Sequence, residues 1–188
     1  SLTLTFSGCD ITDQGVSTLC SEGLQNLTQL TSLALGFYDC NYIKDQGLKN
    51  LSSQGLSQLP QLTLLILSFS RCSFLTNEAL DFCFSVISRL TKLTVLKFDF
   101  SECRYVEMTN NEVSYLCSEC LKSLTELTSF QLNLSHCNKI THVEMKNLCS
   151  KQQVDHWTQL KSFIINNRDY LQPFFLKVNL PKTINVSM

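Results

Sequence analysis

An internal repeat constrains this chain more than any other feature of its sequence. The stretch Leu30–Ile43, LTSLALGFYDCNYI, returns at residues 62–75, 93–106 and 127–140, with worn copies at the start and near the end of the chain. Its leading leucine recurs at steps of 32, 31, 34 and 33 residues, at Leu30, Leu62, Leu93, Leu127 and Leu160. A period of this length indicates a solenoid, in which each unit buries its apolar face against its neighbours.

Each unit combines two hydrophobic periods. Apolar residues first alternate with polar ones, as at Leu33, Leu35 and Phe37, which predicts a strand with one buried face. A helical stripe follows, made in the second unit by Leu48, Leu51, Leu56 and Leu59. Strands joined by helices run parallel and place the helices on one side. The sequence therefore predicts an α/β solenoid with a parallel sheet on the concave face and helices on the convex face.

Polar residues just before these stripes are expected to start the helices. Thr12, Asp13, Asp45 and Thr76 can each cap the helix of their own unit. The repeat array is predicted to span residues 1–170, with a truncated first unit. Residues 171–188 are predicted to be a tail that covers the last open face of the core. Because the chain starts inside a unit, we expect it to be a fragment of a longer array.

The placement of the cysteines argues against a disulfide-stapled protein. Ten cysteines are present, and five of them follow the strand at the same place in successive units: Cys9, Cys40, Cys72, Cys103 and Cys137. Stacked units bring equivalent residues side by side, so an inner member of this column has no unique partner. We therefore expect buried thiols, a reducing compartment and an intracellular, cytoplasmic location.

Charge and motifs exclude several classes of function. Lys and Arg number 15 against 16 Asp and Glu, which indicates neither a basic patch for nucleic acid nor a polybasic patch for a membrane surface. No apolar run approaches the roughly 20 residues that span a bilayer, so we expect no membrane insertion. The chain has no glycine-rich phosphate loop and no nucleophile or metalloprotease motif. Cys117 and Cys120 form a C-x-x-C that lacks a second pair at zinc-finger spacing. We expect a protein that is not an enzyme, with no catalytic residues, cofactor or metal.

The outward residues of each strand are then the informative ones, because they face the hollow of the solenoid. They are short, polar and mixed in sign, and concave solenoid faces commonly dock partners. Tyr and Arg are enriched at interface hot spots, which favours Tyr38 and Arg71 as anchors. The residues predicted to bind a partner protein are Tyr38, Asp39, Ser68, Arg71, Asp99, Glu102, Asn133 and His136.

The repeated pattern resembles the leucine-rich repeat family. Leu35-x-Phe-x-x-Cys40-x-x-Ile43-x-Asp-x-Gly47-Leu48 is similar to the cysteine-containing class, and the unit length is similar to that of the ribonuclease-inhibitor-like class. The resemblance covers about residues 1 to 170. It implies an α/β horseshoe with a parallel concave sheet.

Three functions compatible with this resemblance stay open. The first is a non-enzymatic scaffold or adaptor, part of a larger assembly, that binds another protein through its concave face or rim. The second is substrate recognition within a ubiquitin-ligase receptor, since F-box receptors contain cysteine-containing repeats. The third is a ribonuclease-inhibitor-like or GTPase-activating regulator, which needs a positioned arginine such as Arg71 or Arg168.

Overall fold

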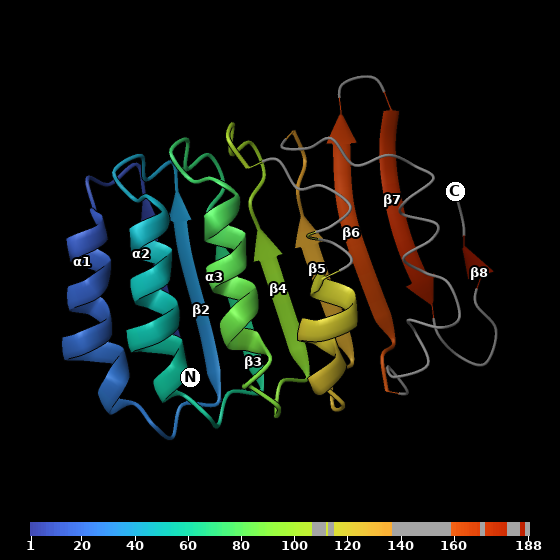
Figure 1. The fold of residues 1–188 in the computed structure, drawn as a ribbon, viewed down its shortest axis with the longest axis horizontal. Coiled ribbons are helices and arrows are strands. Elements are labelled where there is room, and N and C mark those ends of the chain that lie inside the picture. Colours follow the sequence, from blue (N-terminus) through green and yellow to red (C-terminus); the bar gives the residue numbers. More distant parts are fainter. Residues whose placement is uncertain (107–111, 113–114, 137–158, 170–171, 180–184, 187–188) are drawn as a thin grey trace.

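One sheet organises the molecule. The computed structural model describes residues 1–106, 112, 115–136, 159–169, 172–179 and 185–186, and all structural statements refer to these. The strands follow one another in the sheet in chain order (Figure 1). They are β1 (Leu2–Ser7), β2 (Ser32–Tyr38), β3 (Leu64–Ser68), β4 (Val95–Asp99), β5 (Ser129–Asn133), β6 (Ser162–Asp169), β7 (Gln172–Asn179) and β8 (Asn185–Val186).

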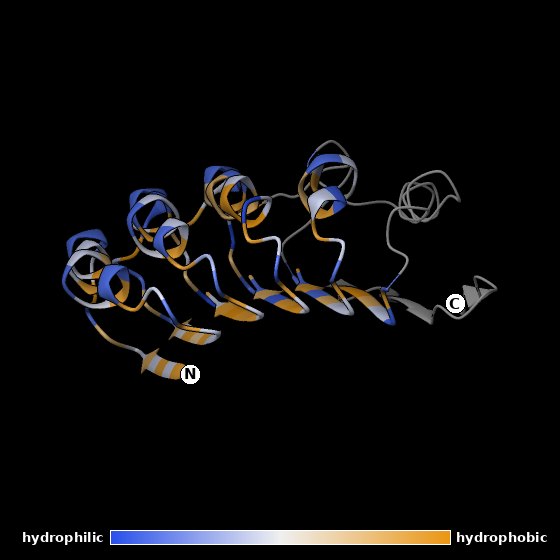
Figure 2. Ribbon diagram, turned by 90° about the horizontal axis from the view of Figure 1, so that it is seen from below, coloured by the Kyte–Doolittle hydropathy of each residue, from blue (hydrophilic) through white to orange (hydrophobic). Residues whose placement is uncertain are grey.

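The first six strands are parallel and in register with the repeat. Equivalent residues of neighbouring strands pair along the sheet, as in the row Leu4, Leu35, Leu67, Phe98, Leu132 and Ile165. The sheet is curved, and the helices lie on the outside of the curve (Figure 2). The predicted α/β solenoid is therefore confirmed. We number its units 1 to 6 by the strand that each contributes.

The core lies between the sheet and the helices. The inward residues of β2 to β5 are buried, including the predicted Leu33, Leu35 and Phe37, whereas Leu2, Leu4 and Phe6 of β1 are partly buried. At the end of the strands, phenylalanine rings stack from one unit to the next, with centroids 5.3 Å apart for Phe6–Phe37, 5.3 Å for Phe37–Phe69 and 5.5 Å for Phe69–Phe100. This column fixes the strand ends, and with them the loops at that edge.

The helices differ between units. In units 1 and 2 a short α-helix leads into a π-helical turn and then a 3₁₀ turn; these are α1 (Asp13–Thr18), η1 (Leu19–Gly23), η2 (Leu24–Asn26), α2 (Asp45–Asn50), η3 (Leu51–Gly55) and η4 (Leu56–Gln58). Unit 4 ends in the same way, with η5 (Leu116–Cys120) and η6 (Leu121–Ser123). Only in unit 3, among the described helices, does an uninterrupted α-helix run through, α3 (Asn77–Ile87).

Two of the four predicted helix caps are wrong. Thr12 and Thr76 do cap their own helices, since their hydroxyls accept from the backbone N–H of Gly15 and Glu78 at 3.3 Å. Asp13 and Asp45 bond to the following unit instead. Asp13 Oδ1 accepts from the Lys44 N–H at 2.8 Å, and Asp45 accepts from both the N–H and the hydroxyl of Thr76 at 2.8 Å. Each carboxylate lies within reach of the next loop, so the aspartates join neighbouring units.

The cysteine column is confirmed where the structure describes it. Cys40, Cys72 and Cys103 are buried, and none of the seven cysteines whose side chains are described forms a disulfide. Each thiol donates to a carbonyl of the preceding unit: Cys72 Sγ lies 2.9 Å from the Phe37 oxygen and Cys103 Sγ 3.0 Å from that of Phe69. Burial raises the pKa of the Cys72 thiol to about 12. Cys9 is exposed, contrary to expectation, because no unit precedes it in the structure; Cys137 lies outside the described residues.

The sheet changes direction after unit 6. Strand β7 runs antiparallel to β6 along its whole length, from Asp169↔Gln172 to Ser162↔Asn179, and β8 is antiparallel to β7. The predicted capping tail contains both strands, while the boundary at residue 170 stays a prediction. No helix among the described residues is long and apolar enough to cross a membrane.

Candidate functional site

The predicted concave residues form one row across the sheet. Ser68, Asp99 and Asn133 end strands β3, β4 and β5, and the strand register places each beside the next. All three are partly exposed on the face opposite the helices. The equivalent position of this row in β2 is Gly36, which contributes no side chain to the surface. The structure therefore brings these predicted residues together.

Two members of this row also shape the backbone. Asp99 Oδ1 accepts from the Ser101 N–H at 2.9 Å, and Asn133 Oδ1 accepts from the N–H and hydroxyl of Ser135 at 3.2 and 2.8 Å. Such bonds to the residue two positions on favour a tight turn. These side chains thus turn the chain out of the sheet, and part of their hydrogen-bonding capacity is used there.

The residue that leaves the sheet in each unit has a left-handed backbone. Positive φ values of 55°, 62°, 59° and 67° occur at Asp39, Arg71, Glu102 and His136, and Gly8 has 57°. We call these five residues the rim. This conformation is unfavourable for most residues other than glycine. Four of the five rim residues nevertheless carry polar side chains: Asp39, Arg71, Glu102 and His136. The rim is therefore a polar surface that recurs from unit to unit.

Backbone bonds hold the rim in register. The N–H groups of Gly8, Asp39, Arg71 and Glu102 donate to carbonyls of the next unit at 2.8 to 2.9 Å. The parallel pairing therefore continues past the strands, and the rim side chains are carried on ordered backbone.

Three predicted residues from three units form one cluster, in which Tyr38, at the end of β2, lies beside the rim residues Arg71 and Glu102. Arg71 Nε lies 3.0 Å from Glu102 Oε2, and the Arg71 guanidinium carbon lies 5.5 Å from the centre of the Tyr38 ring. The hydrogen bond and the charge of Glu102 raise the pKa of Arg71, so the guanidinium stays protonated. An aromatic face and a carboxylate together hold a cation in this cluster.

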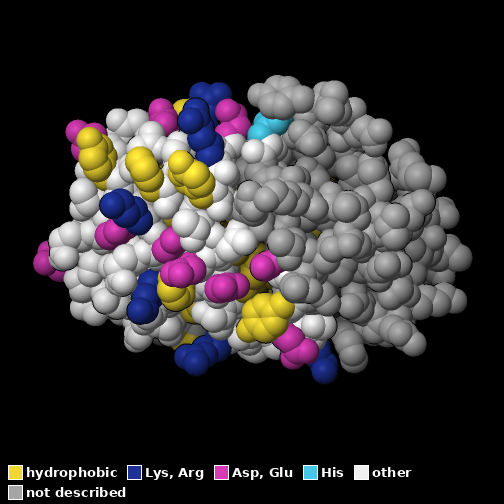
Figure 3. Space-filling model, turned by 45° about the horizontal axis from the view of Figure 1, so that its top comes forward, with side chains coloured by type: hydrophobic (Ala, Val, Ile, Leu, Met, Phe, Trp, Pro, Cys, Tyr) yellow, Lys and Arg dark blue, Asp and Glu magenta, His cyan; other side chains and the backbone are white. Residues whose placement is uncertain are grey.

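The remaining two predicted residues lie on either side of the cluster. Asp39 Oδ1 accepts from Asn41 Nδ2 at 2.8 Å, which orients the loop that follows β2. His136 is exposed in unit 5. Figure 3 brings this edge forward and shows the charged side chains of the rim next to the cyan histidine, the only one that the structure describes.

A row of exposed aromatic residues was missed by the sequence analysis. Tyr42, Phe74 and Tyr105 are 58%, 52% and 61% exposed. Each is the second residue after the inward cysteine of its unit, so the stacking places them in sequence along the edge where strands give way to helices. Figure 3 shows hydrophobic side chains following one another there, beside the charged rim. The signal was available, since Cys-x-aromatic occurs in three consecutive units. We call these three residues the aromatic row.

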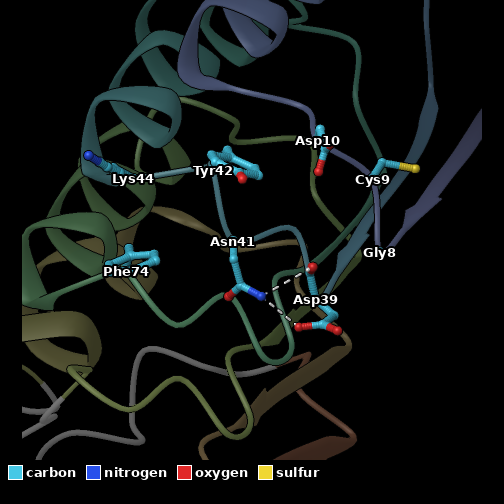
Figure 4. Close-up of a pocket in the computed structure, with 8 residues that line it drawn as sticks. All are labelled: Gly8, Cys9, Asp10, Asp39, Asn41, Tyr42, Lys44 and Phe74. Atoms are coloured by element: carbon cyan, nitrogen blue, oxygen red, sulfur yellow. Dashed lines mark hydrogen bonds between the residues drawn. The ribbon is translucent and has the colours of Figure 1, made fainter.

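A hollow of about 630 Å³ opens beside the first member of this row. Units 1 and 2 and Phe74 of unit 3 surround it, and its lining consists of Gly8, Cys9, Asp10, Asp39, Asn41, Tyr42, Lys44 and Phe74 (Figure 4). The loop of unit 1 is one residue shorter than that of unit 2, with Cys9-Asp10-Ile11 against Cys40-Asn41-Tyr42-Ile43. Unit 1 therefore has no aromatic residue that continues the row, and the hollow lies at that end of the row.

The described residues offer no sign of a metal centre. No group of three His, Cys, Asp or Glu side chains among them could hold an ion. Cys120 of the C-x-x-C is buried, and burial raises its pKa to about 11, while the Cys117 side chain lies outside the description. A buried, protonated thiol is a poor ligand and a poor nucleophile.

Comparisons with known proteins add no family assignment. No protein-family model matches the chain, and no curated protein matches it either. The function is therefore inferred from the geometry of the rim and its surroundings.

Proposed function

We propose that this chain is a leucine-rich-repeat module that binds another protein, without catalysis, through its concave face and rim. The observation that carries the proposal is the Tyr38–Arg71–Glu102 cluster. It combines residues of three units, two of them on the left-handed rim, and lies next to the polar row of Ser68, Asp99 and Asn133.

Physical chemistry supports a binding role for this surface. Conformational strain that persists in side-chain-bearing residues is associated with functional sites. Tyr and Arg are the residues that most often dominate binding energy, and an ordered rim lowers the entropy lost on association. A parallel sheet of six units further provides a continuous platform on which a partner can be contacted by several units at once.

The family and compartment belong to the same proposal. A strand, an inward cysteine bonded to the preceding unit and a helix recur in register, which supports the leucine-rich-repeat assignment. Six buried cysteines without a disulfide support a reducing, intracellular location. Arg71 is engaged by Tyr38 and Glu102, which favours a binding surface over a GTPase-activating arginine.

The test is partner capture with a double variant. Immobilised protein is used to capture partners from cell extract, which are identified by mass spectrometry, and the assay is repeated with Arg71→Glu combined with Asp99→Lys. These changes reverse charge on the rim and the concave row, so we expect at least a tenfold loss of the captured partner, about 1.4 kcal/mol of binding free energy. If the partner is a ubiquitin-ligase component, the receptor alternative gains direct support.

A matched control tests whether the loss of capture depends on where the charges are exchanged. Arg89→Glu combined with Asp81→Lys makes the same two exchanges at exposed positions of unit 3 on the helical face. This control should leave both capture and the thermal midpoint unchanged. The rim variant should stay folded with a slightly lower midpoint, because it loses the Asp99–Ser101 and Arg71–Glu102 bonds. Equal loss in both variants, or unchanged capture in the rim variant, would contradict the proposed surface.

A further inference from the structure

We propose that the hollow between units 1 and 2 binds an arginine side chain of an extended partner segment that lies along the aromatic row. This inference rests on the proposed function and names the chemistry of the partner. Its components are the aromatic side chains of Tyr42 and Phe74 and the carboxylates of Asp10 and Asp39, all of which line the hollow.

The aromatic row is open to a partner. Tyr42, Phe74 and Tyr105 are each more than half exposed, although burying such side chains would be favourable. Single exposed apolar residues are unremarkable, but a repeated row beside an ordered polar rim indicates an interaction surface. Alternate side chains of an extended segment lie roughly 7 Å apart and can contact successive members of such a row.

The charge of the hollow favours a cation. Neither Asp10 nor Asp39 is paired with a cation in the described part of the chain, and Asp39 uses Oδ1 to accept from Asn41. Two cations lie nearby. Lys44 lines the hollow, but in Figure 4 its side chain extends away from both carboxylates. The charge of Asp39 contributes to the raised pKa of Arg71, but the Arg71 guanidinium pairs with Glu102, at 3.0 Å, and not with Asp39. The hollow therefore offers carboxylates to an incoming cation.

A precedent exists within the molecule. On the adjoining rim, an arginine is held between a tyrosine face at 5.5 Å and a carboxylate at 3.0 Å. The hollow contains the same two components, aromatic faces and carboxylates, without the guanidinium. A planar guanidinium stacks on an aromatic ring and bonds a carboxylate at the same time, which a lysine ammonium does less well. This argues for arginine in particular.

The irregular loop of unit 1 accounts for the position of the hollow. Gly8 supplies no side chain to the rim of unit 1, and the shortened loop places Asp10 where later units carry an additional residue and an aromatic side chain. The exposed thiol of Cys9 lies in the same lining. The irregularity of unit 1 thus creates a recess at the end of an otherwise regular surface.

The experiment measures the binding of two labelled peptides to the whole 188-residue chain. Fluorescein-Gly-Leu-Ser-Arg-Ser-Leu-Gly-amide is compared by fluorescence anisotropy with the same peptide carrying citrulline, which has nearly the same shape but no charge. We expect the arginine peptide to bind about tenfold more tightly, and its affinity to fall as salt is raised. Equal affinities of the two peptides would overturn the inference without the use of any variant.

Variants locate the binding to the hollow. Asp10→Asn with Asp39→Asn keeps the side-chain shapes, and asparagine tolerates the left-handed backbone at position 39. This pair should remove the preference for arginine over citrulline. Tyr42→Ala should weaken the arginine peptide at least fivefold, by loss of the stacking face. Glu22→Gln removes one exposed carboxylate elsewhere in the helical segment of unit 1 and should change nothing. A preference for arginine that survives the Asp pair would place its binding elsewhere and overturn the inference.

The two proposals can fail separately. If partner capture responds to the rim variant while the two peptides bind equally, the proposed function stands and the arginine pocket is overturned. If the peptides differ as expected while capture ignores the rim variant, the hollow is supported and the larger docking surface is contradicted.

Discussion

Units 2 and 3 build the same strand but different helices. Leu33, Leu35 and Phe37 in β2 and Leu65, Leu67 and Phe69 in β3 are all buried, and the two strands pair in register. Unit 2 then forms α2 followed by π-helical and 3₁₀ turns, whereas unit 3 forms the continuous helix α3.

One residue accounts for the difference. From the buried Ile43 to Leu62 the chain advances 19 residues, but from Leu75 to Leu93 it advances 18. A π-helical turn accommodates one additional residue within a helix that must still reach the next strand. Unit 1 agrees, since Ile11 and Leu30 are 19 apart and η1 is present. The strands therefore keep the same register in each unit, and the winding of the helix accommodates the difference of one residue.

The largest expected effect comes from deleting a single helix residue. Ser53 and Ser85 are both exposed, the first within η3 and the second within α3. Deletion of Ser85 rotates the following Val86 and Ile87 away from the core by about 100°, which should cost more than about 4 kcal/mol. Deletion of Ser53 should convert the π turn to the winding of unit 3 and cost less than about 2 kcal/mol. Urea unfolding measures both, and a reversed order would contradict the account of the π turn.

The strands should respond alike where the helices do not. Leu35→Ala and Leu67→Ala remove equivalent, fully buried side chains, and each should lower the free energy of unfolding by about 2–5 kcal/mol. Ser68→Ala, on the opposite face of β3, should cost less than about 0.5 kcal/mol. Chemical denaturation of the three variants tests this. A Ser68 effect as large as that of Leu67 would mean that the strand faces are assigned backwards.

A glycine marks the place where the π turn brings the backbone close to its neighbour. A Cβ at Gly55 would lie 2.9 Å from Cys20 Sγ and 3.3 Å from a methyl carbon of Leu24. Gly55→Ala should therefore destabilise the protein by about 1–3 kcal/mol through overpacking, despite the better helix propensity of alanine. The double variant Gly55→Ala with Cys20→Gly relieves the contact and should recover part of the loss in thermal unfolding. A stabilised Gly55→Ala protein would show that the units are packed more loosely.

The helix starts of the two units should differ by a smaller amount. Thr76 caps α3 and also donates to Asp45, whereas Lys44 precedes α2 without a side-chain cap. Thr76→Ala should cost about 1 kcal/mol, within the usual range for lost caps. Lys44→Ala should fall within about 0.5 kcal/mol of the parent. The comparison uses urea midpoints at constant pH, and similar losses would argue against a capping role for Thr76.

The smallest effect near neutral pH concerns the thiols, of which unit 3 buries two. Burial raises the pKa of Cys72 and of Cys83 from 9.0 to about 12. The folded state therefore holds these protons more tightly, so their contribution is complete below pH 9 and is lost as the pH rises from about 9 towards 12. Urea midpoints measured at pH 8 and 10 should fall with pH, and less steeply in Cys83→Ala. The same slope in both proteins would contradict a protonated, buried Cys83.

The sequence predicted the strands well because their period is short and repeated. Every inward leucine or phenylalanine aligned with its counterparts, so the register of six parallel strands followed from the spacing alone. The helix winding was not predicted, because Leu48, Leu51, Leu56 and Leu59 also fit one broad stripe of a regular α-helix. The five-residue step from Leu51 to Leu56, which spans the π turn, was the available signal. The partners of Asp13 and Asp45 were also missed, since local capping rules do not include the next unit of a stack.

The candidate site was predicted in part. Alternation identified the outward residues, and the structure joins Tyr38, Arg71 and Glu102 in one cluster. The left-handed backbone of the rim was not predicted, because Arg71 and Glu102 are not residue types that favour a positive φ, and the enrichment of Asp and His in this conformation is a weak signal. The aromatic row was not predicted, because the alternation that identifies outward residues ends with the strand and does not extend into the loop beyond the cysteine.

Because β7 runs antiparallel to β6, a further parallel unit cannot pair with the free edge of β7 as it would with the edge of β1. New copies of a strand-and-helix unit can be inserted between existing ones, or ahead of β1, and still find a parallel edge to join. A copy placed immediately after β6 would first have to displace β7 along all eight of its pairs. We expect gene duplication to have added units between existing ones or ahead of β1, so that proteins of different length built on this plan share their final unit and differ upstream of it.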